Sequence, residues 1–184
     1  LLNRFAMKAC NLAYYHRHVS KCTEGVMHYD PFFYPLDAIH RWNRLYGSRG
    51  FLQYQCVVPY DGEGGAIQEV LRRVVQAGEA SFLSVLKIFG AKRSPGMLSF
   101  PRPGVTLALD LPNAGPPTLR LLEELDDVVR ATGGAVYPAK DARMSSDNFK
   151  VFFPQWEEFS RYLDPQFSSN LWRRVTRTMS PGQA

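Results

Sequence analysis

The chain has 184 residues, of which 45% are hydrophobic and 13% aromatic, and this is enough to bury a core in one domain, or in one domain with an appendage. The composition excludes disorder over most of the length, and no apolar run approaches the ~20 residues that a membrane span needs. The net charge of +5 is modest and interleaved with acidic residues, so we expect no nucleic acid partner.

Two arginine clusters stand out in the charge pattern. Arg41, Arg44 and Arg49 form one cluster, and Arg72 with Arg73 forms the other. Such clusters are typical of solvated helix faces, but they could also attract a phosphorylated ligand or an anionic membrane surface. The pattern therefore leaves room for a peripheral membrane contact.

The first third of the chain predicts short elements joined by loops. Residues 3–18 carry apolar side chains at helical spacing, which predicts a first helix. Segment 29–35 contains two prolines and is predicted to stay extended, after which Asp37 caps a short helix that ends at Gly47. The first residues lack the features of a signal peptide. Because the first residue is Leu1 and not a methionine, we expect further residues upstream.

The three cysteines do not indicate a disulfide framework or a metal site. An odd number of cysteines argues against paired disulfides. Cys10, His16, His18 and Cys22 lie close in sequence, but their spacing matches none of the usual zinc patterns. We therefore expect no bound metal.

The central part alternates strands and helices. Strands are predicted over 51–58, 81–89, 105–111 and from 135 to 137, and helices over 66–76 and 118–131. The order β-α-β-β-α-β is that of the ferredoxin-like, split βαβ arrangement, an α+β fold in which an antiparallel sheet carries two helices on one face. Gly62, Gly64 and Gly65 lack the third glycine of a dinucleotide loop, so they predict a plain strand-to-helix turn.

The last part of the chain changes character after Tyr137. Three short helices are predicted over 145–153, 156–163 and 167–175, followed by a frayed tail from 179 to 184. Their aromatic residues are many for such short helices: Phe149, Phe152, Phe153, Trp156, Phe159 and Trp172. This surplus predicts an apolar surface that packs on a larger partner, or that is covered by self-association or by repacking within the chain.

Several polar residues stand in otherwise apolar strands and form the candidate site. Gln53 and Gln55 share one face of their strand, because side chains two residues apart point the same way. Lys87 interrupts an apolar run, and Lys140 follows the last strand. A buried lysine needs an anion, a carboxylate or solvent nearby, because an unpaired buried charge is costly. Lys87 could instead extend from the end of its strand into water. Together these donors suit a polyhydroxyl or phosphate ligand, with Phe89 as an apolar wall.

At these residues the sequence resembles the decaprenylphosphoryl-ribose 2′-oxidase family of FAD-linked oxidases, within the vanillyl-alcohol-oxidase superfamily. The blocks that carry the resemblance run from about residue 30 to about 175 and include Trp42–Gly47, Gly50–Gln55, Leu86–Gly90, Leu98–Pro101 and Tyr137–Arg143. The resemblance implies an FAD cofactor bound to a domain that precedes this chain. It also implies a substrate-binding domain over 1–135 and a segment over 136–184 that returns to complete the FAD domain.

The resemblance also assigns roles to individual residues. Lys140 and Tyr137 would lie beside the flavin and the reacting sugar, as catalytic and cofactor-binding residues, and the substrate pocket would be lined by Gln53, Gln55, Lys87, Phe89 and Thr106. Thr106 stands where mycobacterial members have Asn, Ala108 where they have Cys, and Phe33 where they have Tyr. These departures leave the sugar and lipid specificity open.

The implied reaction is oxidation of the 2′-hydroxyl of a polyprenyl-phosphate-linked ribose for cell-wall arabinan synthesis, with a separate reductase as partner. We expect this chain to be inactive without the flavin domain. We also expect a bacterial cytoplasmic or membrane-associated protein, with the periplasm left open. Two alternatives remain: a domain of an alditol or aldonolactone oxidase, and a non-catalytic module that binds a glycolipid phosphate.

Overall fold

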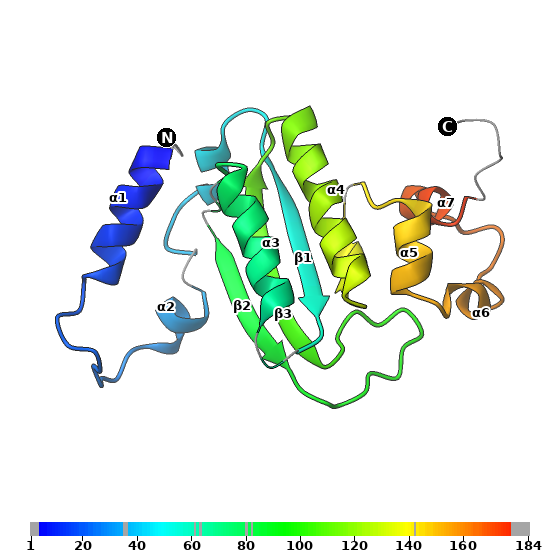
Figure 1. Ribbon diagram of the computed structural model, residues 1–184, viewed down its shortest axis with the longest axis horizontal. Coiled ribbons are helices and arrows are strands. Elements are labelled where there is room, and N and C mark those ends of the chain that lie inside the picture. Colours follow the sequence, from blue (N-terminus) through cyan, green and yellow to red (C-terminus); the bar gives the residue numbers. More distant parts are fainter. Residues whose placement is uncertain are drawn as a thin grey trace.

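The computed structural model describes residues 4–34, 37–60, 62, 64–79, 81, 83–141 and 143–177. Its centre is a four-stranded antiparallel sheet with the strand order β2-β3-β1-β4. The elements of this unit are β1 (Phe51–Val58), α3 (Gly65–Gln76), β2 (Ser84–Phe89), β3 (Gly104–Pro112), α4 (Pro116–Ala131) and β4 (Ala135–Val136). Both helices cover the same face of the sheet (Figure 1). The predicted ferredoxin-like α+β fold is confirmed.

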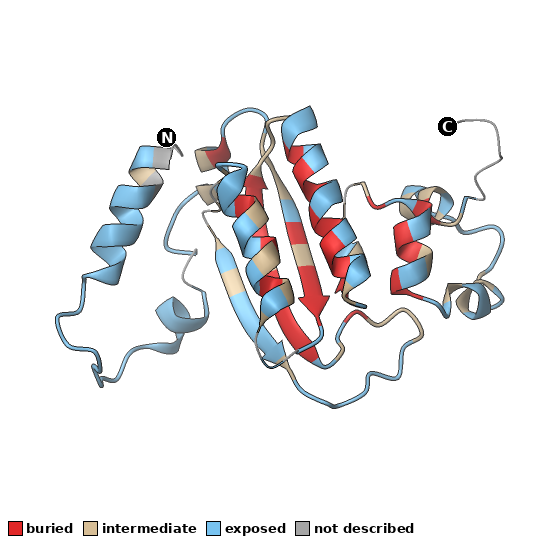
Figure 2. Ribbon diagram, in the orientation of Figure 1, coloured by how far each residue is buried: buried red, intermediate tan, exposed pale blue. Residues whose placement is uncertain are grey.

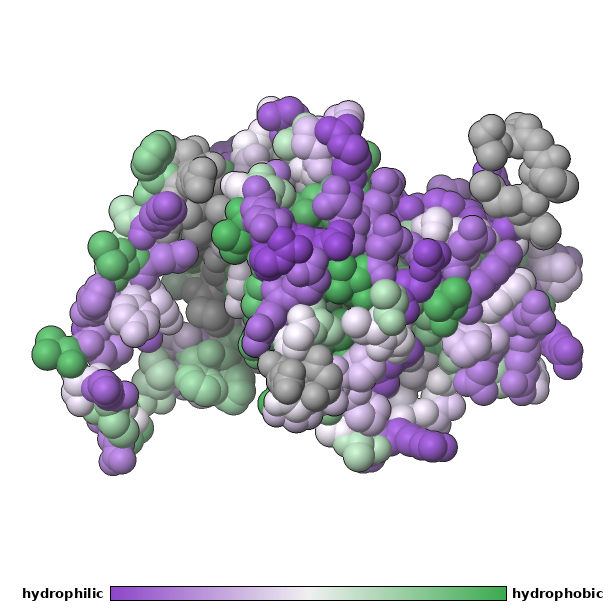
Figure 3. All heavy atoms as spheres, in the orientation of Figure 1, coloured by the Kyte–Doolittle hydropathy of each residue, from purple (hydrophilic) through white to green (hydrophobic). Residues whose placement is uncertain are grey.

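Side-chain alternation divides the sheet into a core face and an open face. Toward α3 and α4 the central strands present apolar side chains, among them Cys56 from β1 and Leu107 from β3, which are buried against Val70 and Leu125 of the helices. Figure 2 shows this buried layer between the sheet and the helices, and Figure 3 shows polar side chains over their outer surface. The other face carries the alternate residues of the same strands.

The strand register fixes which residues are neighbours on the open face. Gln53 lies opposite Asp110, Gln55 opposite Ala108, and Lys87 opposite Thr106. The β2 ladder begins at Ser84, three residues later than predicted. Before that point the backbone N–H of Asp110 donates to the side chain of Ser81, at 2.8 Å, so a side chain takes part where ladder pairing was expected.

The N-terminal segment contains α1 (Arg4–Tyr15), α2 (Tyr29–Phe33) and the 3₁₀ helix η1 (Trp42–Tyr46), and all residues from 8 to 34 are exposed. The first helix was predicted, but the extended conformation predicted for 29–35 is wrong over α2. Pro31 is tolerated there because it lies in the first turn, where a backbone N–H has no helical partner, and His28 caps the helix by accepting from the N–H of Asp30.

The short helix before Gly47 also begins later than predicted. Its first flanking residue is Arg41, at φ 56°, and not Asp37. This left-handed conformation interrupts the backbone between Asp37 and Trp42, so Asp37 cannot act as the cap. The predicted end is confirmed, since Gly47 adopts φ 77° and its N–H donates to the carbonyl of Arg44.

The C-terminal part consists of η2 (Pro138–Lys140), α5 (Ser146–Phe152), α6 (Trp156–Ser160) and α7 (Asn170–Val175). The side chains of Ser145 and Ser169 cap α5 and α7 by accepting backbone N–H groups at 3.2 and 3.0 Å. Of these helices α5 lies beside α4, and α6 and α7 lie beyond α5 (Figure 1). The tail predicted from 179 to 184 lies outside the described residues.

The aromatic residues of this part are mostly internal. Phe149, Phe152 and Phe153 are 2%, 0% and 1% exposed, and they belong to the same core as the sheet and α4. Trp172 packs edge-on against Phe149, with ring centroids 6.1 Å apart. Of the two predicted ways to cover these rings, packing within the chain is the one seen for Phe149, Phe152 and Phe153. Packing on a partner stays a prediction. The domain boundary between 135 and 136 stays a prediction.

No helix in the described part of the chain is long and apolar enough to cross a membrane.

Candidate functional site

A hollow on the open face of the sheet brings most of the predicted site together. Residues from all three long strands line it, together with one from η2: Gln53, Gln55, Leu83, Val85, Lys87, Thr106, Ala108, Asp110 and Lys140. They meet because the antiparallel register places alternate residues of β1, β2 and β3 side by side. Four of the predicted substrate-binding residues and the predicted catalytic lysine are thus neighbours.

Hydrogen bonds orient the two glutamines. The Nε2 of Gln53 donates to Oδ1 of Asp110 at 3.0 Å, and the Nε2 of Gln55 donates to Oγ1 of Thr106 at 3.2 Å. Thr106 is 1% exposed, whereas Gln53 is exposed at the rim. Each bond joins β1 to β3 across the floor, so the floor presents a fixed set of polar atoms.

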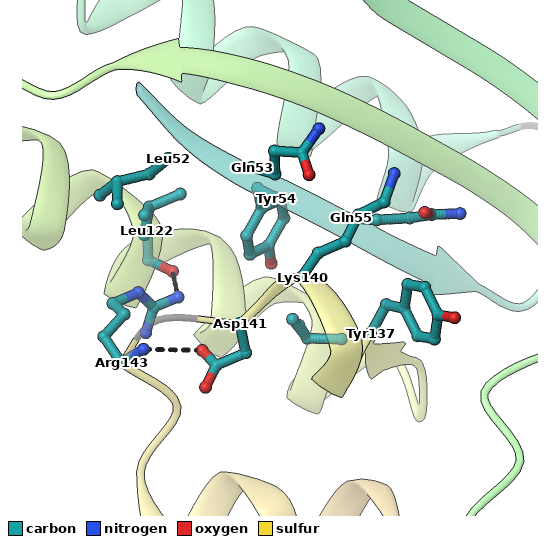
Figure 4. Close-up of a pocket in the computed structure, with 10 residues that line it drawn as sticks. Leu52, Gln53, Tyr54, Gln55, Leu122, Tyr137, Lys140, Asp141 and Arg143 are labelled. Atoms are coloured by element: carbon teal, nitrogen blue, oxygen red, sulfur yellow. Dashed lines mark hydrogen bonds between the residues drawn. The ribbon is translucent and has the colours of Figure 1, made fainter. Parts of the chain in front are cut away.

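Lys87 and Lys140 supply positive charge from opposite sides of the hollow. Lys87 comes from the edge strand β2 and is exposed, and Lys140 is half-buried on η2. In Figure 4 the Lys140 side chain extends across β1 toward Gln55. Among the residues that the structure describes, neither ammonium group has a hydrogen-bond or ion-pair partner in the protein. Both are available to an anionic or hydroxylated ligand.

Tyr137 and Phe89 are not among the residues that line the hollow, and Phe100, which the sequence analysis did not single out, connects their rings. Phe100 stacks on Tyr137 at 4.7 Å and contacts Phe89 edge-on at 6.0 Å. Tyr137 lines an adjoining recess with Gln53, Gln55 and Lys140 (Figure 4), and its backbone N–H donates to the carbonyl of Gln55 at 2.8 Å. The three rings form one aromatic row, and the role of Phe89 as a wall of the substrate pocket stays a prediction.

Asp110 is the main residue that sequence reasoning missed. It is 3% exposed, lies on the floor of the hollow, and interrupts the apolar strand β3 much as Lys87 interrupts β2. Burial raises the pKa of its carboxyl, and the hydrogen bond from Gln53 and the charge of Lys140 oppose that rise. An acidic residue in an apolar strand is visible in the sequence, but its pairing with Gln53 follows only from the register of β1 and β3.

Ion pairs behind the hollow hold the turn that carries Lys140. The carboxylate of Asp141 accepts the backbone N–H groups of Arg143 and Met144, at 2.9 and 2.6 Å, and pairs with Arg174. Arg143 in turn binds the fully buried Asp126 through both terminal nitrogens, at 2.9 Å each. These contacts tie the segment after β4 to α4 and fix the position of η2.

The arrangement suits a ligand that carries hydroxyl groups and negative charge. Two cations, a carboxylate, two amides and a hydroxyl surround the floor, and aromatic rings stand beside it. A metal is a poor match, since no group of three or more His, Cys, Asp or Glu side chains gathers within the described ranges. Cys10, His16, His18 and Cys22 belong to the exposed N-terminal segment.

Comparison with known proteins identifies the class of this chain. No protein-family model matches it. It is 36% identical, over 95% of its own length, to a protein of Mycolicibacterium smegmatis that is an oxidase. This relative places the chain in an oxidoreductase family.

The relative is the decaprenylphosphoryl-β-D-ribose oxidase, and the chain belongs to its family. The chain is also 36% identical, over 76% of its own length, to an uncharacterized protein in the mprA 5′ region of Streptomyces coelicolor. The chain spans 38% of the length of each of these two relatives. The predicted family resemblance is confirmed.

Proposed function

We propose that this chain is the substrate-binding part of a flavin-dependent oxidase that acts on a hydroxyl group of a polyprenyl-phosphate-linked sugar. The observation that carries the proposal is the hollow itself, where Gln53, Gln55, Lys87, Thr106 and Lys140 meet on one sheet face. Such a set of donors around a polar floor matches a phosphorylated polyol. The family relationship supports the redox chemistry.

Residues 1–135 form the substrate-binding domain in this proposal, and residues 136–184 complete a flavin domain that precedes the chain. Lys140 fits a position beside the cofactor, because its ammonium group lies at the border of the hollow and has no hydrogen-bond or ion-pair partner within the described residues. Bound FAD would supply the hydride acceptor for the carbinol carbon.

The protein's own residues have separate tasks in this proposal. Lys140 offers a fixed positive charge where negative charge develops, Tyr137 stands beside it, and Lys87 binds the anionic part of the substrate from the opposite strand. Gln53, Gln55 and Thr106 hold the sugar, and the ring of Phe89 extends the apolar wall. A reductase partner, peripheral membrane contact and self-association remain part of the proposal.

Flavin reduction in the complete protein tests the proposal. Lys140→Met keeps much of the side-chain length and removes the charge, so we expect flavin reduction by decaprenylphosphoryl-β-D-ribose to slow by about a hundredfold, as for the loss of one preorganised donor. Lys87→Met should instead raise the substrate concentration needed for half-maximal reduction and leave the saturated rate less affected. Stopped-flow absorbance separates the two effects.

Wild-type rates in Lys140→Met would contradict the role of this residue. A complete protein without a flavin domain would favour the binding-module alternative, and reduction by free alditols or aldonolactones would favour that branch of oxidases. Each outcome identifies a different function for the same hollow.

A further inference from the structure

The carboxylate of Asp110, which lines the hollow, has one oxygen in a hydrogen bond and one without a hydrogen-bond partner within the described residues. Oδ1 accepts the hydrogen bond from Gln53 at 3.0 Å, while Oδ2 is buried and has no hydrogen-bond partner among the residues that the structure describes. The residue as a whole is 3% exposed and lines the hollow between the two lysines. A buried polar atom without a partner is costly, which calls for an explanation.

Local structure does not explain this carboxylate. The backbone of Asp110 is already held by other groups: its N–H donates to the side chain of Ser81 at 2.8 Å, and its carbonyl accepts from the hydroxyl of Tyr46 at 3.4 Å. The side chain caps no helix and closes no turn; its bond to Gln53 uses one oxygen only. The fold therefore gives Oδ2 no hydrogen bond within the described residues.

The composition of the hollow shows what the free oxygen could bind. Lys87 and Lys140 only donate hydrogen bonds, and Gln53 and Gln55 each use one of their two amide N–H groups across the floor. Within the described lining, Asp110 is the anionic acceptor. A ligand that fits must donate to Asp110 and accept from the lysines, and a sugar hydroxyl does the first while a phosphate or ring oxygen does the second.

We infer that Asp110 is a specificity-determining substrate-binding residue whose Oδ2 accepts a hydrogen bond from one ribose hydroxyl. The inference rests on the proposed function, because it assigns a contact within the same site. A buried acceptor of this kind discriminates strongly against an analogue that lacks the hydroxyl, since the oxygen then stays unpaired in the complex.

Binding of neutral ribosides to the complete protein tests the inference. The probes are methyl β-D-ribofuranoside and its 2-deoxy, 3-deoxy and 5-deoxy forms, measured by calorimetry. We expect Asp110→Asn, which presents a donor in place of the acceptor, to weaken binding of the parent riboside by at least about tenfold. The affinity for the one deoxy form that lacks the contacted hydroxyl should not change.

The matched control is Asp127→Asn on the exposed side of α4, where the carboxylate is 68% exposed; it should leave all affinities unchanged. Asp110→Thr, whose β-branched side chain suits a strand and still offers Gln53 an oxygen, provides the same test if Asp110→Asn does not fold. The thermal midpoint of the unliganded variants should stay the same or rise, because an unpaired buried charge is removed.

Three outcomes are distinguishable. Loss of affinity for the parent riboside but not for one deoxy form supports the inference. Equal loss for all four probes, or a lowered thermal midpoint with unchanged discrimination, shows that Asp110 is structural and overturns it while the proposed function stands. Failure of every riboside to bind the wild-type protein overturns the inference, and it overturns the proposed function as well only if decaprenylphosphoryl-β-D-ribose also fails to reduce the flavin.

Discussion

The ion pair between Arg143 and Asp126 holds a charged carboxylate inside the protein, where it depends on its counter-charge. Asp126 is fully buried, and Arg143 is 14% exposed. Arg143→Met leaves that carboxylate without its counter-charge, so we expect a loss of about 3–5 kcal/mol in the free energy of unfolding. Arg72→Met, which removes an exposed pair with Glu69 at 2.6 Å, should cost less than about 1 kcal/mol. Urea denaturation of both variants compares the two; similar losses would contradict the role of the buried pair.

Cys56 provides a second test at the residue scale. It lies in the core face of β1, and burial raises the pKa of its thiol to about 12, so at about pH 8 only about one thiol in ten thousand is ionised. Cys10 and Cys22 are exposed. We expect a chromogenic disulfide reagent to label these two in the native protein and to reach Cys56 only after denaturation. Rapid labelling of three thiols under native conditions would show that the sheet opens.

The sequence predicted much of the site at this scale because strand periodicity places side chains on faces. Gln53 and Gln55 could be assigned to one face two residues apart, and Lys87 was conspicuous in an apolar run. Asp110 was missed because its significance depends on the register with Gln53, and Phe100 because it lies in a loop without periodicity. Register and loop paths are set by tertiary contacts, which single residues do not reveal.

At the scale of elements, the junction between α4 and β4 depends on one close approach. A Cβ atom on Gly134 would lie 2.4 Å from the carbonyl oxygen of Val57 and 2.9 Å from Cγ1 of Val129. Gly134→Ala should therefore destabilise the protein by about 1–3 kcal/mol through overpacking. Gly90→Ala, at an exposed position with open space around it, should stay within about 0.5 kcal/mol. Thermal unfolding measures both, and equal midpoints would refute the close approach.

Elements with strong periodicity were predicted well, and those ruled by local backbone chemistry were not. α3 and α4 begin within two residues of their predicted starts, because each has a continuous apolar stripe. α2 was missed because proline was taken as a breaker where it occupies the first turn, and the start of η1 was misplaced because a left-handed Arg41 leaves no sequence signal. In the C-terminal part, α6 ends at Ser160 and α7 begins at Asn170, each three residues inside its predicted bound.

For the whole molecule, we predict that the isolated 184-residue chain purifies without flavin. In this chain only Lys140 and Tyr137 are proposed to contact the cofactor. Gly62 and Gly64, in the connection between β1 and α3, do not belong to a dinucleotide-binding fingerprint. Gel filtration followed by visible absorbance is the measurement, with the complete protein as the positive control. A nearly stoichiometric flavin band that co-elutes with the isolated chain would disprove the prediction.

The antiparallel register has a consequence for how this sequence can vary. Along β1, Gln53 and Gln55 face the hollow, while Tyr54 and Cys56 between them face the core. A single inserted residue at the start of the strand would exchange the two sets, turning both amides into the helix layer and the tyrosine and thiol toward the ligand. Residues of the hollow and residues of the core thus alternate along this strand. Substitutions can alter either separately, but a change of length in this strand disrupts both at once.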